Sequence, residues 1–220
     1  MTEAADTTVH LVRHGQVDNP GGVLYGRLAG YHLSELGRQM ADKVADHFDG
    51  ANVTHLRCSP LERARETMEP IAAHHPELDV VIDDRVIEAG NKFEGHIFGR
   101  RNLPLFNPRM FWHMRNPMRP SWGEPYREIA DRMRAAMLDA AAAAGPGGQA
   151  VIVSHQLSIW MARRSLEGRS LFHDPRTRQC SLASVTSFVF RGTRVLRVEY
   201  AEPAAELLPV KTGRRFRVGT

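Results

Sequence analysis

The sequence of 220 residues has only two cysteines, Cys58 and Cys180, so it cannot form the disulfide framework of a small secreted domain. It also lacks an apolar run near the roughly 20 residues that cross a membrane, because Asp139 interrupts the alanine-rich stretch before Gly145. Residues 1–9 lack the basic start and apolar run of a signal peptide. We therefore expect a cytoplasmic protein with no membrane partner.

The body of the chain lacks an excess of either charge. The formal net charge is +4, from 29 Lys and Arg against 25 Asp and Glu. Four of the basic residues lie in the tail 211–220, which holds no acid, so the other 210 residues carry 25 charges of each sign. A basic excess can indicate a nucleic-acid partner. Because this excess belongs to a short tail, we expect no nucleic-acid binding.

The eleven histidines do not occur at metal-ligand spacings. His10 and His14 are four residues apart, but on a strand this separates them by roughly 13 Å, too far to share one ion. His74 and His75 are expected to be solvated at a helix end. We expect no metal and no other cofactor.

Short β-branched runs alternate with segments of helical period, which is typical of an α/β fold. Buried strands are predicted at residues 9–12, 53–56, 80–82 and 151–153. A helix is predicted over residues 35–48, capped by Ser34, and another over about 157–166. Residues 185–190 and 193–200 are typical of a hairpin. The expected architecture is a three-layer sandwich, with a mostly parallel central sheet and helices on both faces.

A further helix is predicted to start directly after Ser59. Pro60 would take the first helical position, and Glu62 would complete a capping box with the Ser59 hydroxyl. This start places Arg63 close to the N-terminal end of the helix.

Residues 90–125 break the alternation and are rich in proline, arginine and aromatic residues. Long connections of this kind are often functional loops or lids. We predict one domain over residues 1–220, with 90–125 as an inserted cap beside the carboxyl edge of the sheet. An irregular packed excursion, or the contact of a homodimer, is the alternative.

Charged residues and histidines follow the predicted strands. Arg13 and His14 end the first strand and His155 ends the last parallel one, while the second and third strands lead to Arg63 and Glu88. The carboxyl ends of parallel strands meet at one sheet edge, where ligands bind. An imidazole can attack phosphorus, arginines can bind its oxygens, and a carboxylic acid can protonate the leaving alkoxide. The pattern favours phosphoryl transfer through a phosphohistidine.

Three motifs in order resemble the histidine phosphatase superfamily, the phosphoglycerate mutase-like family. Leu11–Gly15 (LVRHG) is similar to its signature, Ser59–Ile71 (SPLERARETMEPI) to its second motif, and Val153–His155 to its last. The resemblance implies His14 as the nucleophile and Glu88 as the proton donor that later activates water. It also implies a phosphate pocket made of Arg13, Arg63, His14 and His155, with His155 counted as catalytic.

Two more residues, Gln16 and Asn19, fall where relatives contact the phosphoryl group, and the backbone N–H of Gln156 is a further candidate for phosphate binding. The asparagine offset is one residue longer than usual, and relatives often have glycine where this chain has Gln156. The sequence EAGNKFEG around Glu88 resembles the acid motif but is one residue short, which leaves Glu94 as a second candidate for the acid.

We therefore expect a phosphatase that hydrolyses a phosphomonoester, a small anionic phosphorylated metabolite, through a phosphohistidine. One alternative is a cofactor-dependent phosphoglycerate mutase. In that branch Arg-His-Tyr-Gly follows the acid, whereas Ala89, Gly90 and Asn91 follow Glu88 here, which favours the phosphatase. A non-catalytic phospholigand-binding scaffold is the other alternative, although the nucleophile, both arginines, the second histidine and a candidate acid are all present.

Overall fold

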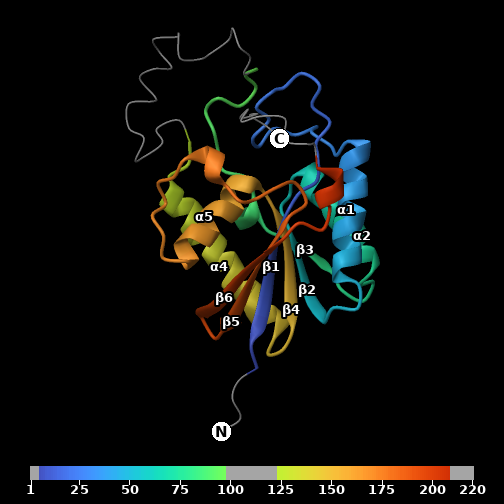
Figure 1. Ribbon diagram of the computed structural model, residues 1–220, viewed down its shortest axis with the longest axis vertical. Helices are drawn as coiled ribbons and strands as arrows, with labels where there is room; N and C mark the ends of the chain where they lie inside the picture. The colour runs from blue at the N-terminus through green and yellow to red at the C-terminus, as the bar shows by residue number, and fades with distance from the viewer. Residues whose placement is uncertain (1–4, 98–122, 209–220) are drawn as a thin grey trace.

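A computed structural model describes residues 5–97 and 123–208 (Figure 1). Six strands form one mixed sheet in the order β3-β2-β4-β1-β5-β6. The strands are β1 (Thr7–Arg13), β2 (Val53–Cys58), β3 (Val80–Ile82), β4 (Gln149–Ser154), β5 (Val185–Arg191) and β6 (Arg194–Ala201). The neighbouring strands from β3 to β1 pair in parallel, whereas β5 pairs antiparallel with both β1 and β6. The predicted α/β fold with a mostly parallel sheet, and the predicted hairpin, are confirmed.

Helices cover both faces of this sheet, as predicted. They are α1 (Glu35–Phe48), α2 (Glu62–Ala73), α4 (Tyr126–Ala144) and α5 (Gln156–Leu166), with short 3-10 turns at Asp84–Val86, Pro175–Thr177 and Ala205–Leu207. The pair α1 and α2 packs on one face and the pair α4 and α5 on the other (Figure 1). Neighbouring residues of β1 therefore face different cores: Leu11 packs with α4 and α5, and Val12 with α1 and α2.

The helix α1 has the predicted bounds and the predicted cap. The Ser34 hydroxyl accepts a hydrogen bond from the backbone N–H of Gly37, which satisfies one of the free donors of the first turn. Its buried side holds apolar residues such as Met40 and Val44.

The predicted start of α2 at Ser59 is wrong. The helix begins at Glu62, its N-cap residue is Leu61, and no side chain caps it. The Ser59 hydroxyl is fully buried and lies 2.8 Å from the Nε2 atom of His155. A tertiary contact has thus replaced the capping bond that the local pattern predicts.

The strand at residues 80–82 exists, but the prediction that it is buried is wrong. Val81 and Ile82 are 40% and 47% exposed. The physical reason is the strand order, because β3 pairs only with β2 and forms an edge of the sheet.

Most of the predicted cap, residues 98–122, lies outside the described residues. In the part of the chain that the structure describes, no helix is both long enough and apolar enough to span a membrane.

Candidate active site

The sheet topology brings His14 and His155 together. β1 pairs in parallel with β4, and Arg13 is in register with Ser154, so the residues that follow both strands leave the sheet at the same edge. The two imidazole centroids lie 5.2 Å apart, and both rings are buried. Two residues separated by most of the chain therefore form one site, as their motifs predict.

The surroundings of His14 favour a neutral imidazole with a defined lone pair. The Nδ1 atom lies 2.7 Å from the carbonyl oxygen of Gly15, which can only accept, so Nδ1 carries the hydrogen and Nε2 the lone pair. Burial lowers the pKa of His14 well below its ordinary value, and the positive charges of Arg63 and Arg13 lower it further. The ring therefore stays neutral at pH 7 and can act as a nucleophile through Nε2.

His155 is fixed by the buried hydroxyl of Ser59. The Ser59 Oγ atom lies 2.8 Å from Nε2 of His155 and also accepts a weak bond from the backbone N–H of Leu61. The hydroxyl hydrogen can then point to Nε2, which leaves the imidazole hydrogen on Nδ1. That Nδ1 atom is buried and has no partner in residues 5–97 and 123–208. Burial, followed by the charge of Arg63, lowers the pKa of His155 well below its usual range.

Two buried guanidinium groups complete what we call the histidine–arginine cluster: Arg13, His14, Arg63 and His155. Arg13 donates from Nη1 to the Cys180 carbonyl at 2.8 Å, and Arg63 from Nη2 to the Gly26 carbonyl at 2.6 Å. Within the described residues, Nε of both arginines and Nη1 of Arg63 are buried without acceptors. Buried donors normally have partners, so this group of free N–H bonds suits the oxygens of a phosphoryl group.

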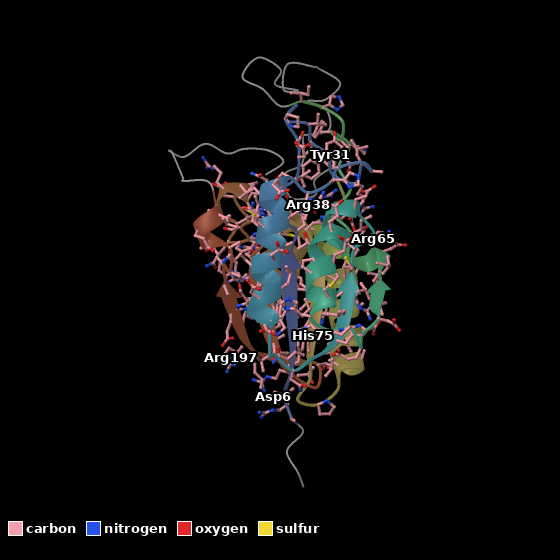
Figure 2. The ribbon with its side chains drawn as sticks, turned by 90° about the vertical axis from the view of Figure 1, so that its right-hand side faces the viewer. Asp6, Tyr31, Arg38, Arg65, His75 and Arg197 are labelled. Atoms are coloured by element: carbon pink, nitrogen blue, oxygen red, sulfur yellow. The ribbon has the colours of Figure 1, made fainter. Side chains whose placement is uncertain are left out.

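Two residues for which no role was predicted, Tyr25 and Thr67, hold this cluster in place. The Tyr25 ring lies 4.7 Å from the Arg63 guanidinium and stacks on Tyr31. Figure 2 shows Tyr31 at the carboxyl end of the strands, opposite Asp6. The Thr67 hydroxyl accepts from the backbone N–H of Gly15 at 3.1 Å and donates to the Arg63 carbonyl at 2.7 Å.

The position of Thr67 near the cluster could have been predicted from its spacing of four residues from Arg63. Residues four apart lie on the same face of a helix. The predicted helix therefore places Thr67 on the same face as Arg63.

Both candidate acids lie near Arg63, and Glu88 is the more closely coupled of the two. Burial lowers the pKa of Arg63, and the negative charges of Glu88 and Glu94 oppose that shift, with Glu88 acting more strongly. Burial raises the pKa of Tyr25, and the charge of Glu88 raises it further against the two arginines of the cluster. Each carboxylate also accepts a bond from a nearby backbone N–H, Glu88 from Ala89 at 2.7 Å and Glu94 from Asn91 at 3.0 Å, and Glu94 packs against Gly26.

The other three predicted phosphate ligands have protein partners. The amide of Asn19 is bonded to both backbone groups of Val23, and Gln16 accepts from the Ser34 hydroxyl at 2.8 Å. Gln156 donates to the Cys180 carbonyl at 3.4 Å and so lies beside the Arg13 contact. Phosphate binding by Gln16, by Asn19 and by the backbone N–H of Gln156 stays a prediction.

Metal ligation is a separate question. Within the described ranges, no group of three or more histidine, cysteine, aspartate or glutamate residues is placed to hold a metal ion.

A neutral imidazole, unpaired buried guanidinium donors and a nearby carboxylate are the groups found in proteins that transfer a phosphoryl group. A family model of the histidine phosphatase superfamily (branch 1) matches residues 9–202. The chain belongs to this superfamily, and the resemblance seen in its motifs is confirmed.

Relatives of this chain agree with that family. It is 50% identical over 200 residues to the uncharacterised protein Rv0525 of Mycobacterium tuberculosis, covering 91% of this chain and 98% of the relative. A probable phosphoglycerate mutase, GpmB, of Cronobacter sakazakii is 28% identical over 186 residues, covering 80% and 83% of the two chains. The fold also matches a phosphoserine phosphatase of Entamoeba histolytica, with a TM-score of 0.72, 23% identity and coverage of 92% and 100%.

Proposed function

We propose that this protein is a phosphatase that hydrolyses small phosphomonoesters through a phosphohistidine at His14. The observation that carries the proposal is the neutral His14 ring with its lone pair on Nε2, beside guanidinium and imidazole N–H groups that have no acceptor in the described residues. These donors can bind the phosphoryl oxygens while Nε2 attacks phosphorus.

In the first step, the Nε2 lone pair of His14 forms a bond to phosphorus and the bond to the ester oxygen breaks. The Glu88 carboxylic acid gives its proton to that oxygen, and the alcohol leaves. The imidazole now carries a positive charge, and its Nδ1 hydrogen remains bonded to the Gly15 carbonyl. Arg13, Arg63 and His155 stabilise the charge on the three phosphoryl oxygens.

In the second step, the Glu88 carboxylate takes a proton from a water molecule and the resulting hydroxide attacks phosphorus. The bond between phosphorus and Nε2 breaks, inorganic phosphate leaves, and His14 regains its lone pair. Glu88 is again a carboxylic acid, so the cycle needs no other proton donor. Its coupling to Tyr25 and Arg63 supports Glu88 over Glu94 in this role.

A trapping experiment tests the nucleophile. Wild-type protein mixed with a labelled phosphomonoester should yield an acid-labile phosphoenzyme, whereas His14→Ala should yield none and should lose nearly all hydrolysis of p-nitrophenyl phosphate. His10→Gln is a matched control, since His10 is also a buried histidine and lies in β1, but it bonds to Ser187 and Gln149. Hydrolysis by His14→Ala at the wild-type rate would refute the proposal.

A second experiment assigns the acid. Glu88→Gln should slow the hydrolysis of an alkyl phosphate more than Glu94→Gln, because an alkoxide needs the proton in order to leave. The reverse order would move the role to Glu94.

A phosphoglycerate mutase is the second candidate, favoured by the similarity to GpmB over 80% of this chain. A mutase would interconvert phosphoglycerate isomers when primed with the bisphosphate and would release little phosphate. The proposed phosphatase would release phosphate with or without the primer. Assaying 3-phosphoglycerate under both conditions separates the two candidates.

A further inference from the structure

Arg178 lies beside the histidine–arginine cluster without belonging to any predicted motif. Its Nη1 lies 3.4 Å from Oε1 of Gln156, the residue that follows His155. The other end of the same Gln156 amide donates to the Cys180 carbonyl, which also accepts from Arg13. A continuous chain of hydrogen bonds therefore links the Arg178 guanidinium to the guanidinium of Arg13.

A hydrogen bond to His173 fixes the orientation of the Arg178 guanidinium. Arg178 donates from Nε to Nε2 of His173 at 2.9 Å, and Nδ1 of His173 lies 2.9 Å from the Leu171 carbonyl. The ring must therefore be neutral, with its hydrogen on Nδ1. Its centroid lies 5.6 Å from that of Tyr126 and 6.1 Å from that of Trp160, so the aromatic rings limit its movement.

Arg178 has more donors than acceptors. A guanidinium carries five N–H bonds, and the contacts with His173 and Gln156 use two of them. In residues 5–97 and 123–208, Arg178 has no ion pair with a carboxylate, whereas its neighbour Arg176 in the same loop pairs with Asp174 at 2.6 Å. Burial lowers the pKa of Arg178, while the charges of Tyr126 and Glu88 raise it.

Arg178 is partly buried, and a guanidinium that loses part of its hydration costs free energy unless an anion compensates for it. Arg13 and Arg63 already provide two positive charges for the phosphoryl group. Arg178 adds a third guanidinium, which is linked to Arg13 through Gln156 and held in one orientation. Its positive charge is more than one phosphoryl group requires.

We propose that Arg178 binds a second anionic group of the substrate, a carboxylate or a further phosphoryl group. The enzyme would then prefer phosphomonoesters that carry another acid over those with a neutral organic part. This inference rests on the proposed function, because it assumes that the first phosphoryl group binds at the histidine–arginine cluster. Gln156, which replaces a small residue of many relatives, supports the Arg178 guanidinium at this position.

Non-hydrolysable phosphonates test the assignment by equilibrium binding, independently of turnover. Propylphosphonate has one acid, 3-phosphonopropionate adds a carboxylate, and 1,3-propylenediphosphonate adds a second phosphonate. Calorimetric titration of the wild-type protein should show that one or both ligands with two acids bind about 10-fold or more tightly than propylphosphonate, the range of a charge-assisted contact. The ratio of the dissociation constants of these two ligands shows whether the site prefers a carboxylate or a phosphoryl group.

The variant Arg178→Met should abolish this preference while leaving the affinity for propylphosphonate nearly unchanged. Arg178→Lys should keep part of it, because the charge remains but the bidentate geometry is lost. Arg176→Met is the matched control from the same loop and should keep the full preference. Thermal melting of each variant confirms that it is folded.

The outcomes separate this inference from the proposed function. Equal binding of all three phosphonates by the wild type, or a preference that survives in Arg178→Met, would overturn the role of Arg178 even if phosphate release is observed. A preference that depends on Arg178, in a protein that hydrolyses no phosphomonoester, would support the anion site and refute the phosphatase.

Discussion

The hydroxyl of Ser59 lies 2.8 Å from Nε2 of His155, and both residues are fully buried. This contact joins the end of β2 to the end of β4, which are neighbouring strands of the sheet. When the hydroxyl donates to Nε2, the imidazole hydrogen of His155 lies on Nδ1, a buried atom without a partner in the described residues.

We predict that Ser59→Ala lowers kcat/KM about 10-fold, because one neutral hydrogen bond contributes about 1 kcal/mol and a free imidazole can also adopt the wrong tautomer. Steady-state hydrolysis of p-nitrophenyl phosphate measures this. Ser187→Ala is a matched control, since Ser187 also lies 2.8 Å from a buried histidine, His10, but away from the cluster. Equal losses in the two variants would mean that Ser59 acts only on stability.

The sequence predicts the positions of the two histidines but not the contact that Ser59 makes. His14 and His155 could be predicted because each follows a strand, and parallel strands end at one edge. The role of Ser59 could not, since the same hydroxyl can cap a helix or bond to an imidazole. The outcome depended on a partner 96 residues away. A long-range contact of this kind can override a local capping pattern, and the local sequence does not show that it will.

Arg178 escaped prediction for a different reason. It lies in the irregular connection between α5 and β5, which has no apolar period to place it. Only the folded chain shows that the Cys180 carbonyl bonds to Arg13 and thereby brings this connection to the cluster. The exposure of β3 was equally non-local, because it follows from the order of the strands rather than from their composition.

The position of Glu88 depends on Arg27, which donates from Nε to the Glu88 carbonyl and from Nη2 to the Glu124 carboxylate, both at 2.7 Å. We predict that Arg27→Met slows alcohol release from an alkyl phosphate several-fold, because a displaced acid transfers its proton less efficiently. Release of p-nitrophenol should fall less, since that leaving group needs little help from a proton. Burst-phase kinetics measure both rates.

Arg38→Met provides the comparison for Arg27→Met. Arg38 also has an exposed side chain and pairs with a carboxylate, that of Glu66, on the face formed by α1 and α2 (Figure 2). Its loss should leave both rates unchanged. If Arg27→Met slows the two substrates equally, Arg27 does not act through Glu88.

The two histidines of the histidine–arginine cluster make stability depend on pH. Burial, followed by the charge of Arg63, lowers the pKa of His14 and of His155 well below the ordinary 6.5. As pH falls below about 6.5, the unfolded chain binds protons at these rings and the folded chain does not, so stability is lost down to the folded pKa. Each ring can contribute up to about 1.4 kcal/mol per pH unit in that window.

Urea denaturation at about pH 7.5 and about pH 5.5 tests this dependence. The drop in unfolding free energy should be smaller in His155→Gln than in the wild type by up to about 1.4 kcal/mol per pH unit, because one depressed pKa is gone. His74→Gln, which changes an exposed histidine at the end of α2, should leave the drop unchanged. A wild-type stability that rises toward pH 5.5 would contradict the assignment of neutral rings.

The loop that carries His14 approaches α1 so closely that only glycine fits at residue 37. A Cβ atom at Gly37 would overlap the backbone oxygen of Gln16, and one at Gly15 would overlap the oxygen of Gly37. Helix propensity alone favours Gly37→Ala by about 1 kcal/mol, because glycine is a poor residue inside a helix. The close approach predicts the opposite sign, a loss of about 1 to 3 kcal/mol as the loop is displaced.

Displacement of this loop should also reach the nucleophile, because the Gly15 carbonyl holds Nδ1 of His14. We therefore expect Gly37→Ala to lower both the unfolding free energy and the rate of His14 phosphorylation. Gly21→Ala is the control, since a Cβ there would meet only Val23 Cγ2, at 3.6 Å. If Gly37→Ala is more stable and phosphorylated at the wild-type rate, the loop can move away from α1 freely, and its contact with the helix does not position His14.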